Sequence, residues 1–239
     1  MILSALGTES MTATPAATPE TPGLTRRAVI FDLDGTLVDS LDDIATALNG
    51  ALAALGRPTA AREVVRHWIG DGLTELCRRA LPAMDDATLH ALIDAARRRY
   101  RGHSLDRTRP YAGIEPLLGR LRDRAVPMAV LSNKPHDLTL DILRGLGLEV
   151  FFDVVRGLKE ESDRKPAPGP ALEIARALGR PPGDIYLVGD GPTDVGAARA
   201  AGMVAVGVSW GFRGVDELRA AGAEWIVDRP EEIARLEGL

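Results

Sequence analysis

Cysteine, lysine and long apolar runs are scarce in this chain of 239 residues. The single cysteine, Cys77, excludes an internal disulfide and is typical of a reducing compartment, so we predict a cytoplasmic location. No apolar stretch approaches the roughly 20 residues that a membrane-spanning helix needs. The formal net charge of −5 gives no general attraction to nucleic acid or to an anionic membrane, and we predict neither as a partner.

Residues 1–24 carry little charge and show neither a helical nor a strand periodicity. They are rich in Ala, Thr and Pro, and they lack the basic start and the longer apolar core of a signal peptide. This composition predicts a disordered tail. Met11 is an alternative start to Met1, and the sequence leaves that choice open.

The rest of the chain alternates short apolar, β-branched runs with helix-like stretches of roughly 10–15 residues. This is the spacing of repeated β-α-β units, and it predicts an α/β protein with a parallel sheet. The strand candidates are 28–31, 127–131, 185–188, 204–208 and a weaker one at 225–227.

One interval interrupts this alternation, because it contains only helical patterns. It runs from about 41 to 105 and begins directly after the first strand candidate. We therefore predict a helical cap over 41–105, placed above the end of that strand, and a core made of residues 25–40 and 106–239. Helices inside the cap are predicted at 41–55, 61–80 and 86–103.

Two aspartates lie two positions apart where the first strand candidate ends. Side chains at i and i+2 of a strand point to the same side, so Asp32 and Asp34 are predicted to face one site at the carboxyl edge of the sheet. One carboxylate can act as a covalent nucleophile, and the other can transfer a proton. Gly35 allows the backbone to turn sharply and to approach a ligand.

Polar groups that suit a phosphate or a cation follow two later strand candidates. Ser132 and Asn133 end the second one and can donate hydrogen bonds to phosphate oxygens. Asp190 and Asp194 follow the third, and their carboxylates suit a hard cation such as Mg²⁺.

The few lysines give an independent indication. The chain has 26 arginines but only Lys134, Lys159 and Lys165. An ammonium is a compact charge that can neutralise two anionic groups at one point, whereas a guanidinium is a wide planar fork. Lys165 is therefore a candidate to bridge an aspartate and a phosphoryl oxygen. For Lys134 two interpretations stay open, a second functional lysine or a solvated surface lysine.

Together these residues resemble the haloacid dehalogenase-like superfamily and, within it, the phosphoglycolate phosphatases. The resemblance covers about residues 26 to 228. Each motif alone is weak evidence, because pairs such as DxD occur by chance, but four motifs in this order are specific. They are Asp32-Leu33-Asp34-Gly35-Thr36, Ser132, Lys165, and Gly189-Asp190 through Asp194.

The resemblance implies a Rossmann-like, three-layer α/β/α core with a helical cap inserted after the first strand. It implies that Asp32 attacks phosphorus to form an aspartyl-phosphate, and that Asp34 protonates the leaving alkoxide and then deprotonates water. Lys165 would assist catalysis, and the phosphoryl group would be held by Thr36, Ser132, Asn133 and Lys165. Mg²⁺ would be bound by Asp32, Asp34 (through its backbone carbonyl), Asp190 and Asp194.

The same resemblance predicts a small anionic phosphate ester as substrate, with 2-phosphoglycolate preferred. The segment Ile69-Gly70-Asp71-Gly72-Leu73 is similar to the glycine-bearing cap loop of that family, and its backbone amides are expected to meet the substrate's carboxylate. A plain interhelical turn is the alternative. The chain departs from the family pattern at Asp42, where a proline is common, and at Gly191, where a serine is common.

Other functions fit the same core. A broad-specificity sugar-phosphate phosphatase or a pyrophosphatase is the main alternative. A sugar phosphomutase lacks support, because the histidine that mutases carry soon after the position of Asp39-Ser40 is absent. A non-catalytic binding protein would not need every catalytic position filled. The sequence does not distinguish a monomer from a homodimer, nor a role in DNA-end repair from one in carbon fixation.

Overall fold

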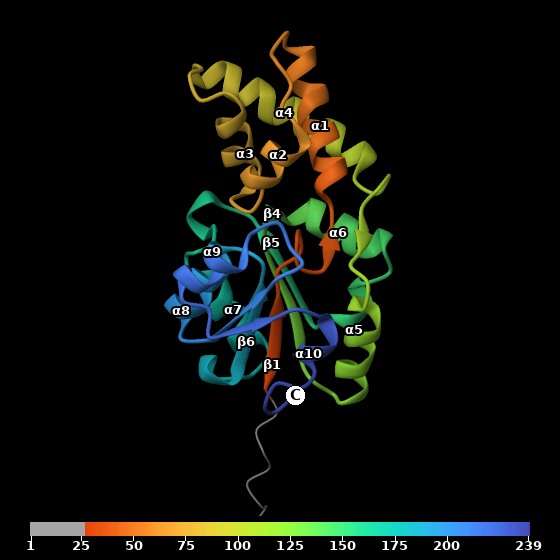
Figure 1. The fold of residues 1–239 in the computed structure, drawn as a ribbon, viewed down its shortest axis with the longest axis vertical. Coiled ribbons are helices and arrows are strands. Elements are labelled where there is room, and N and C mark those ends of the chain that lie inside the picture. The colour runs from red at the N-terminus through yellow and green to blue at the C-terminus, as the bar shows by residue number, and fades with distance from the viewer. Residues whose placement is uncertain (1–26) are drawn as a thin grey trace, which may run out of the picture.

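Six parallel strands form the central sheet, in the order β5-β4-β1-β6-β7-β8 (Figure 1). The computed structural model describes residues 27–239, so the tail predicted over 1–24 lies outside the described residues. The predicted α/β fold is confirmed. The strands are β1 (Ala28–Phe31), β4 (Met128–Pro135), β5 (Val154–Leu158), β6 (Ile185–Gly189), β7 (Val204–Val208) and β8 (Trp225–Val227).

Helices connect the strands and cover the sheet. They are α5 (Ile114–Asp123), α6 (His136–Gly145), α7 (Gly169–Ala177), α8 (Pro192–Ala201), α9 (Val215–Ala221) and α10 (Pro230–Ile233). Short 3₁₀ turns lie at η1 (Glu149–Phe151), η2 (Glu161–Asp163) and η3 (Pro182–Asp184). None of the helices within residues 27–239 is long and apolar enough to cross a membrane.

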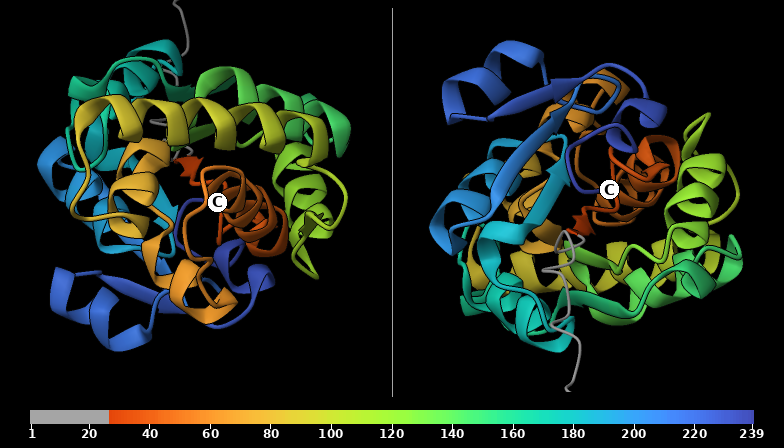
Figure 2. Two further views of the ribbon diagram at one scale, coloured as in Figure 1. Left: turned by 90° about the horizontal axis from the view of Figure 1, so that it is seen from above. Right: turned by 90° about the horizontal axis from the view of Figure 1, so that it is seen from below.

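The central strand shows why both faces of the sheet are covered. All four residues of β1 are fully buried, as expected for a parallel strand between two helical layers. Val29 and Phe31 belong to one apolar cluster with residues of α5, α6 and α10. Ala28 and Ile30 belong to a second cluster with residues of α7, α8 and α9. Figure 2 shows the resulting layers from above and below.

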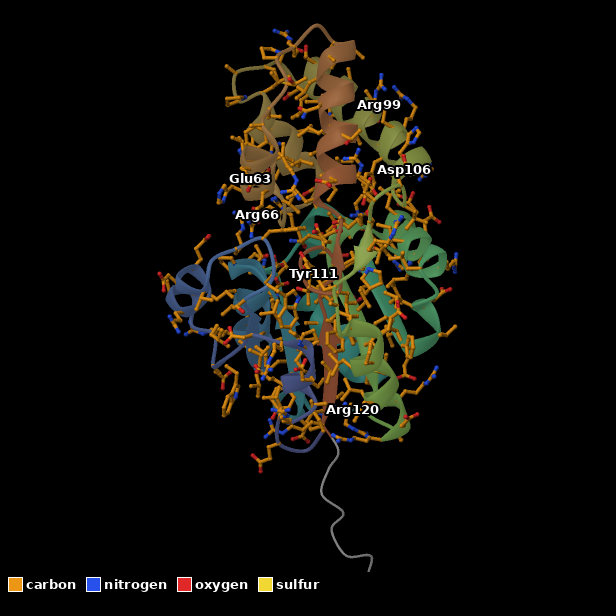
Figure 3. The ribbon with its side chains drawn as sticks, turned by 45° about the vertical axis from the view of Figure 1, so that its right-hand side comes forward. Glu63, Arg66, Arg99, Asp106, Tyr111 and Arg120 are labelled. Carbon is orange, nitrogen blue, oxygen red and sulfur yellow. The ribbon has the colours of Figure 1, made fainter. Side chains whose placement is uncertain are left out.

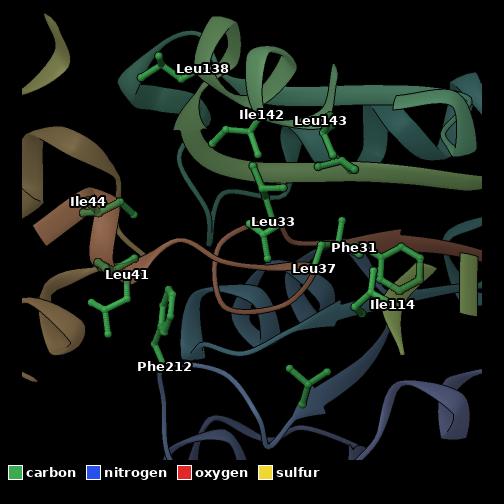
Figure 4. Close-up of a cluster of buried hydrophobic side chains, with 14 of the residues drawn as sticks. Phe31, Leu33, Leu37, Leu41, Ile44, Ile114, Leu138, Ile142, Leu143 and Phe212 are labelled. Atoms are coloured by element: carbon green, nitrogen blue, oxygen red, sulfur yellow. The ribbon is translucent and has the colours of Figure 1, made fainter. Parts of the chain in front are cut away.

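Four more helices lie above the carboxyl ends of the strands (Figure 1). They are α1 (Leu41–Ala54), α2 (Arg62–Trp68), α3 (Gly72–Ala80) and α4 (Asp86–His103). Leu41 and Ile44 of α1 share one apolar cluster with Phe31 and Phe212 of the sheet layer (Figure 4). Two short antiparallel strands, β2 (Val38–Asp39) and β3 (Arg109–Pro110), pair where the chain leaves the sheet layer and returns to it.

The structure corrects three sequence predictions. The single helix predicted over 61–80 is two helices, because the segment between them includes Gly70 at a φ of +118°, which a continuous helix cannot contain. Strand β5 was not predicted, because this edge strand contains a charge and a glycine. Strand β4 extends past the predicted end at 131, so Ser132 and Asn133 lie within it, at an irregularity of its register.

Asp43 of α1 joins the outgoing chain to the returning chain. Its side chain is buried, and its carboxylate accepts hydrogen bonds from the backbone N of Arg107 (3.0 Å), the backbone N of Thr108 (2.8 Å) and the Thr108 hydroxyl (2.7 Å). The neighbouring Asp42 is more exposed and forms an ion pair with Arg62 at 2.5 Å. Asp43 therefore fixes the position of α1 relative to the segment that enters β3.

We expect Asp43→Ala to lower the free energy of unfolding by about 3 kcal/mol, because three donors lose their acceptor. Asp42→Ala is the matched control, and loss of its exposed ion pairs with Arg62 and Arg107 should cost about 0.5 kcal/mol. Urea unfolding followed by circular dichroism measures both values. Equal losses in the two variants would contradict this account of Asp43.

Candidate active site

The carboxyl ends of β1, β4 and β6 bring the predicted polar residues together beneath α1–α4 (Figure 1). Asp32 and Asp34 both line a cavity whose other walls include residues of α1, α3 and α4. The i, i+2 argument does not account for this, since both aspartates lie beyond the last residue of β1. Their carboxylates turn toward different lysines, Asp32 toward Lys165 and Asp34 toward Lys134.

Lys165 is the cation of the first pair and is buried almost completely. Its Nζ lies 2.8 Å from Asp32 Oδ1 and 2.5 Å from Asp194 Oδ1, and it donates a hydrogen bond to the carbonyl of Leu131 at 3.0 Å. Burial disfavours its charge, but the attraction of Asp194 and Asp32 outweighs burial and raises the pKa of Lys165 above its ordinary value. The ammonium is therefore held in its charged form between two carboxylates.

One lysine does not balance the negative charge collected here. Asp32, Asp190 and Asp194 are all buried, and each offers a carboxylate oxygen within 4.8 Å of the others. Burial, together with the charges of Asp194 and Asp34, raises the pKa of Asp32 to about 7 despite Lys165. Burial and the two neighbouring aspartates also raise the pKa of Asp190 well above its ordinary value. Three hard oxygen ligands in a region short of positive charge are the donor set of a divalent cation site.

Hydrogen bonds hold two of these carboxylates in place and leave part of the third free. Asp190 Oδ2 accepts from the backbone N of Phe212 at 2.7 Å, and Asp194 Oδ2 accepts from the backbone N of Gly191 at 3.0 Å. Within the described residues, the buried Asp32 Oδ1 contacts the Lys165 ammonium at 2.8 Å but accepts no hydrogen bond of ordinary geometry. A buried carboxylate oxygen of this kind still has a lone pair for a ligand or an ion.

Asp34 belongs to a second, separate pair. Its two carboxylate oxygens lie 2.7 and 2.6 Å from Nζ of Lys134, and Oδ1 also accepts a hydrogen bond from the Ser40 hydroxyl at 2.6 Å. Lys134 is only 7% exposed, so the interpretation of this lysine as a solvated surface residue is wrong. The other interpretation of Lys134, a second functional lysine, agrees with its position beside Asp34.

Tight turns bring the backbone against these carboxylates. Gly35 has a φ of +87°, and a Cβ atom there would lie 2.3 Å from Asp190 Oδ2, so only glycine fits. Ser132 is buried and lines the cavity. Thr36 is fully buried in the turn after β1, and its hydroxyl makes no hydrogen bond to any of the described residues. The phosphate-binding roles expected of Ser132 and Thr36 stay predictions.

The glycine-bearing loop between α2 and α3 lies directly over this site. Its three successive carbonyls, from Ile69 to Asp71, each accept a hydrogen bond from a side chain of the sheet layer. The donors are Arg213 to Ile69 O (2.8 Å), Asn133 to Gly70 O (2.9 Å) and Arg164 to Asp71 O (3.3 Å). The loop is thus fixed to the sheet layer through its carbonyls, while the predicted contact of its amides with a substrate stays a prediction.

Asn133 connects this loop to Lys165. Its Nδ2 donates to Gly70 O, and its Oδ1 accepts from the backbone N of Lys165 at 2.7 Å. Both ends of the amide are therefore engaged by protein groups. The contact of Asn133 with a phosphate stays a prediction. It would use an amide group that already forms hydrogen bonds to the loop and to the backbone of Lys165.

Several site residues were not found from the sequence. Arg66, labelled in Figure 3, donates to the carbonyls of Gly211 (2.8 Å) and Phe212 (3.1 Å) and so ties α2 to the loop that holds Asp190. Arg66, Arg164 and Arg213 carry no local signal, because arginine is common throughout the chain. The scarcity of lysine was the signal that could single out Lys134.

We expect Lys165→Met to lower the free energy of unfolding by about 3 kcal/mol at pH 7, because it removes the cation from a buried cluster of carboxylates. Lys159→Met is the matched control, since Lys159 is exposed and should contribute almost nothing. Urea unfolding at pH 7 compares the two variants. A loss below about 1 kcal/mol for Lys165→Met would show that the cluster does not depend on this charge.

Comparison with known proteins identifies the family. The sequence pattern of the haloacid dehalogenase-like hydrolases matches residues 29–208. The chain is 36% identical to the phosphoglycolate phosphatase of Pseudomonas putida over 87% of this chain and 78% of that protein, and 36% identical to that of Chromobacterium violaceum over 81% and 90%. The crystal structure of a predicted phosphoglycolate phosphatase from Haemophilus somnus superposes with a TM-score of 0.82 at 29% identity, covering 88% of this chain and 97% of that one. The chain belongs to the haloacid dehalogenase-like hydrolase family, in the group that contains the phosphoglycolate phosphatases.

Proposed function

We propose that this protein is a Mg²⁺-dependent phosphatase that hydrolyses 2-phosphoglycolate to glycolate and phosphate. The observation that carries the proposal is the buried cluster of Asp32, Lys165, Asp190 and Asp194 at the carboxyl edge of the sheet. A carboxylate next to a fixed ammonium and a cation site is the arrangement that phosphoryl transfer needs, because the reaction depends on positioning and on neutralising phosphoryl oxygens. The named activity of the relatives supports the choice of substrate.

The residues at the site fit a magnesium ion. Asp32, Asp190 and the backbone carbonyl of Asp34 would bind it, with Asp194 in support. The fit rests on the three clustered carboxylates and on the buried Asp32 oxygen that lacks a hydrogen bond. When bound, the ion neutralises charge on the phosphoryl oxygens.

The reaction proceeds in two displacements at phosphorus. In the first, a carboxylate oxygen of Asp32 attacks, the bond from phosphorus to the ester oxygen breaks, and Asp34 donates a proton to the leaving glycolate oxygen. In the second, Asp34 takes a proton from water, whose oxygen attacks the phosphorus of the aspartyl-phosphate and releases phosphate and the Asp32 carboxylate. Lys165 and Ser132 hold the phosphoryl group throughout.

Residues 41–105 act as the cap of this enzyme, over a core that comprises 25–40 and 106–239. The apolar cluster that α1 shares with the sheet layer supports this assignment, as does the loop whose carbonyls bind Asn133, Arg164 and Arg213. A cap in this position excludes water from the site, which strengthens the electrostatic interactions inside it.

The first experiment measures phosphate release, with and without Mg²⁺, from 2-phosphoglycolate, glucose phosphates, pyrophosphate and nucleotides. We expect kcat/KM for 2-phosphoglycolate to exceed the others, and Asp32→Asn to reduce kcat by at least about 10³-fold while the protein stays folded. Asp94→Asn, an exposed carboxylate of α4, is the control and should keep full activity. Similar rates across sugar phosphates would indicate a broad-specificity phosphatase, and near-normal activity of Asp32→Asn would exclude Asp32 as the nucleophile.

Mg²⁺ is expected to stabilise the folded protein, because it offsets the repulsion among the three carboxylates. At a concentration of 100 times its Kd the ion should raise the thermal midpoint by about 5–10 °C. Asp190→Asn should abolish this shift, whereas Asp216→Asn, whose side chain is 99% exposed, should retain it. Scanning calorimetry measures the thermal midpoint without substrate. An equal shift in both variants would show that the ion binds elsewhere than at Asp190.

A further inference from the structure

The cavity above Asp34 has an apolar wall and few polar groups. Its helical side includes the apolar side chains of Ile44, Leu48, Leu73 and Leu76. Two cationic side chains line it, Lys134 and Arg97. Arg97 is paired with Asp137 at 2.8 Å, and its side chain is 43% exposed. Lys134 is therefore the buried cation of the cavity, and it approaches from the sheet layer.

Tyr100 of α4 lies against this lysine. Nζ of Lys134 is 4.6 Å from the centre of the Tyr100 ring. The tyrosine is 6% exposed, lines the same cavity, and has a buried hydroxyl that makes no hydrogen bond of ordinary geometry within the described residues. Burial raises the pKa of Tyr100 to about 12, so the hydroxyl keeps its proton and can donate it to an acceptor.

Lys134 and Tyr100 together keep a free donor. The Lys134 ammonium carries three N–H groups and faces the two oxygens of Asp34 and the Tyr100 hydroxyl, and that hydroxyl still has its own O–H to donate. A buried ammonium and a buried phenol thus present donors to one cavity, next to the carboxylate that we assign to proton transfer. Buried donors of this kind are normally satisfied, so they indicate an acceptor that is bound during function.

We propose that Lys134 and Tyr100 form a subsite for a carboxylate on the organic part of the substrate. The inference rests on the proposed phosphatase function and deepens it, because it defines the substrate class as phosphate monoesters of short hydroxy acids. The phosphate lies at Asp32, and the carboxylate accepts hydrogen bonds from Lys134 and Tyr100. The hydroxyls of a sugar would instead be buried against the apolar wall without partners, which disfavours sugar phosphates.

The test compares 2-phosphoglycolate with ethyl phosphate, which keeps a two-carbon leaving group but lacks the carboxylate. We expect the wild-type kcat/KM to favour 2-phosphoglycolate by at least about 100-fold, since a site built to hydrogen-bond a group rejects analogues without it. Tyr100→Phe should reduce this preference by about tenfold, mainly through a higher KM for 2-phosphoglycolate. The control is Tyr186→Phe, which removes a hydroxyl bound to Glu237 at the far end of the sheet and should leave the preference unchanged.

Lys134→Met should reduce the preference further than Tyr100→Phe, while Lys159→Met should not change it. Tyr100→Phe keeps the test decisive even where Lys134→Met is unstable, because within residues 27–239 the lost hydroxyl makes no hydrogen bond of ordinary geometry and its removal leaves the ring in place. Two results would overturn the subsite while the phosphatase function stands. One is a wild-type kcat/KM that is about equal for 2-phosphoglycolate and ethyl phosphate, and the other is an equal loss of kcat/KM on both esters in Tyr100→Phe. Absence of Mg²⁺-dependent release from every ester would overturn the proposed function, and the subsite with it.

Discussion

The contact of Lys165 with Asp32 and Asp194 is the interaction on which the carboxyl edge of the sheet depends. It allows three aspartates to be buried within 4.8 Å of one another, which mutual repulsion and loss of hydration would otherwise prevent. The compensation is incomplete, because the pKa of Asp32 still rises to about 7. A site that remains short of positive charge after folding attracts a cation and a phosphoryl group that arrive together, and this is the electrostatic basis of the proposed function.

The same edge is enclosed by contacts of two kinds. Apolar side chains of α1 continue the core of the sheet layer, and they place the helical layer without defining its orientation in detail. Directional contacts supply that detail: Asp43 fixes the base of α1, and Arg66 with the carbonyls of Ile69 to Asp71 fixes the opposite side. The cavity that contains Asp34 lies between these two sets of contacts, so its shape depends on polar groups far apart in the sequence.

This distribution explains what the sequence could predict. Strands 28–31, 185–188 and 204–208 were found because a buried parallel strand is a continuous apolar run, and the edge strand β5 was missed because it is only partly buried. The aspartates and Lys165 stood out because they follow such runs or belong to a rare residue type. Tyr100 lies on a helix that reads as a basic surface segment, with Arg97 and Arg101 nearby. Tyr100 is nevertheless buried in the apolar cluster and meets Lys134 across the cavity, and no local pattern encodes those contacts.

Lysine and arginine make different contacts around the site because their charged groups differ in shape. Two of the three lysines, Lys134 and Lys165, are buried and contact carboxylates, where a compact ammonium meets two oxygens at once. Two arginines at the junction of the layers, Arg66 and Arg213, instead contact backbone carbonyls, because a long planar fork reaches across that junction. In a chain that otherwise uses arginine, lysine is retained where a small charge has to fit between acidic groups. A guanidinium at Lys134 would fill the space that the proposed subsite leaves for a carboxylate, so the size of this cation, as much as its charge, limits which esters the cavity accepts.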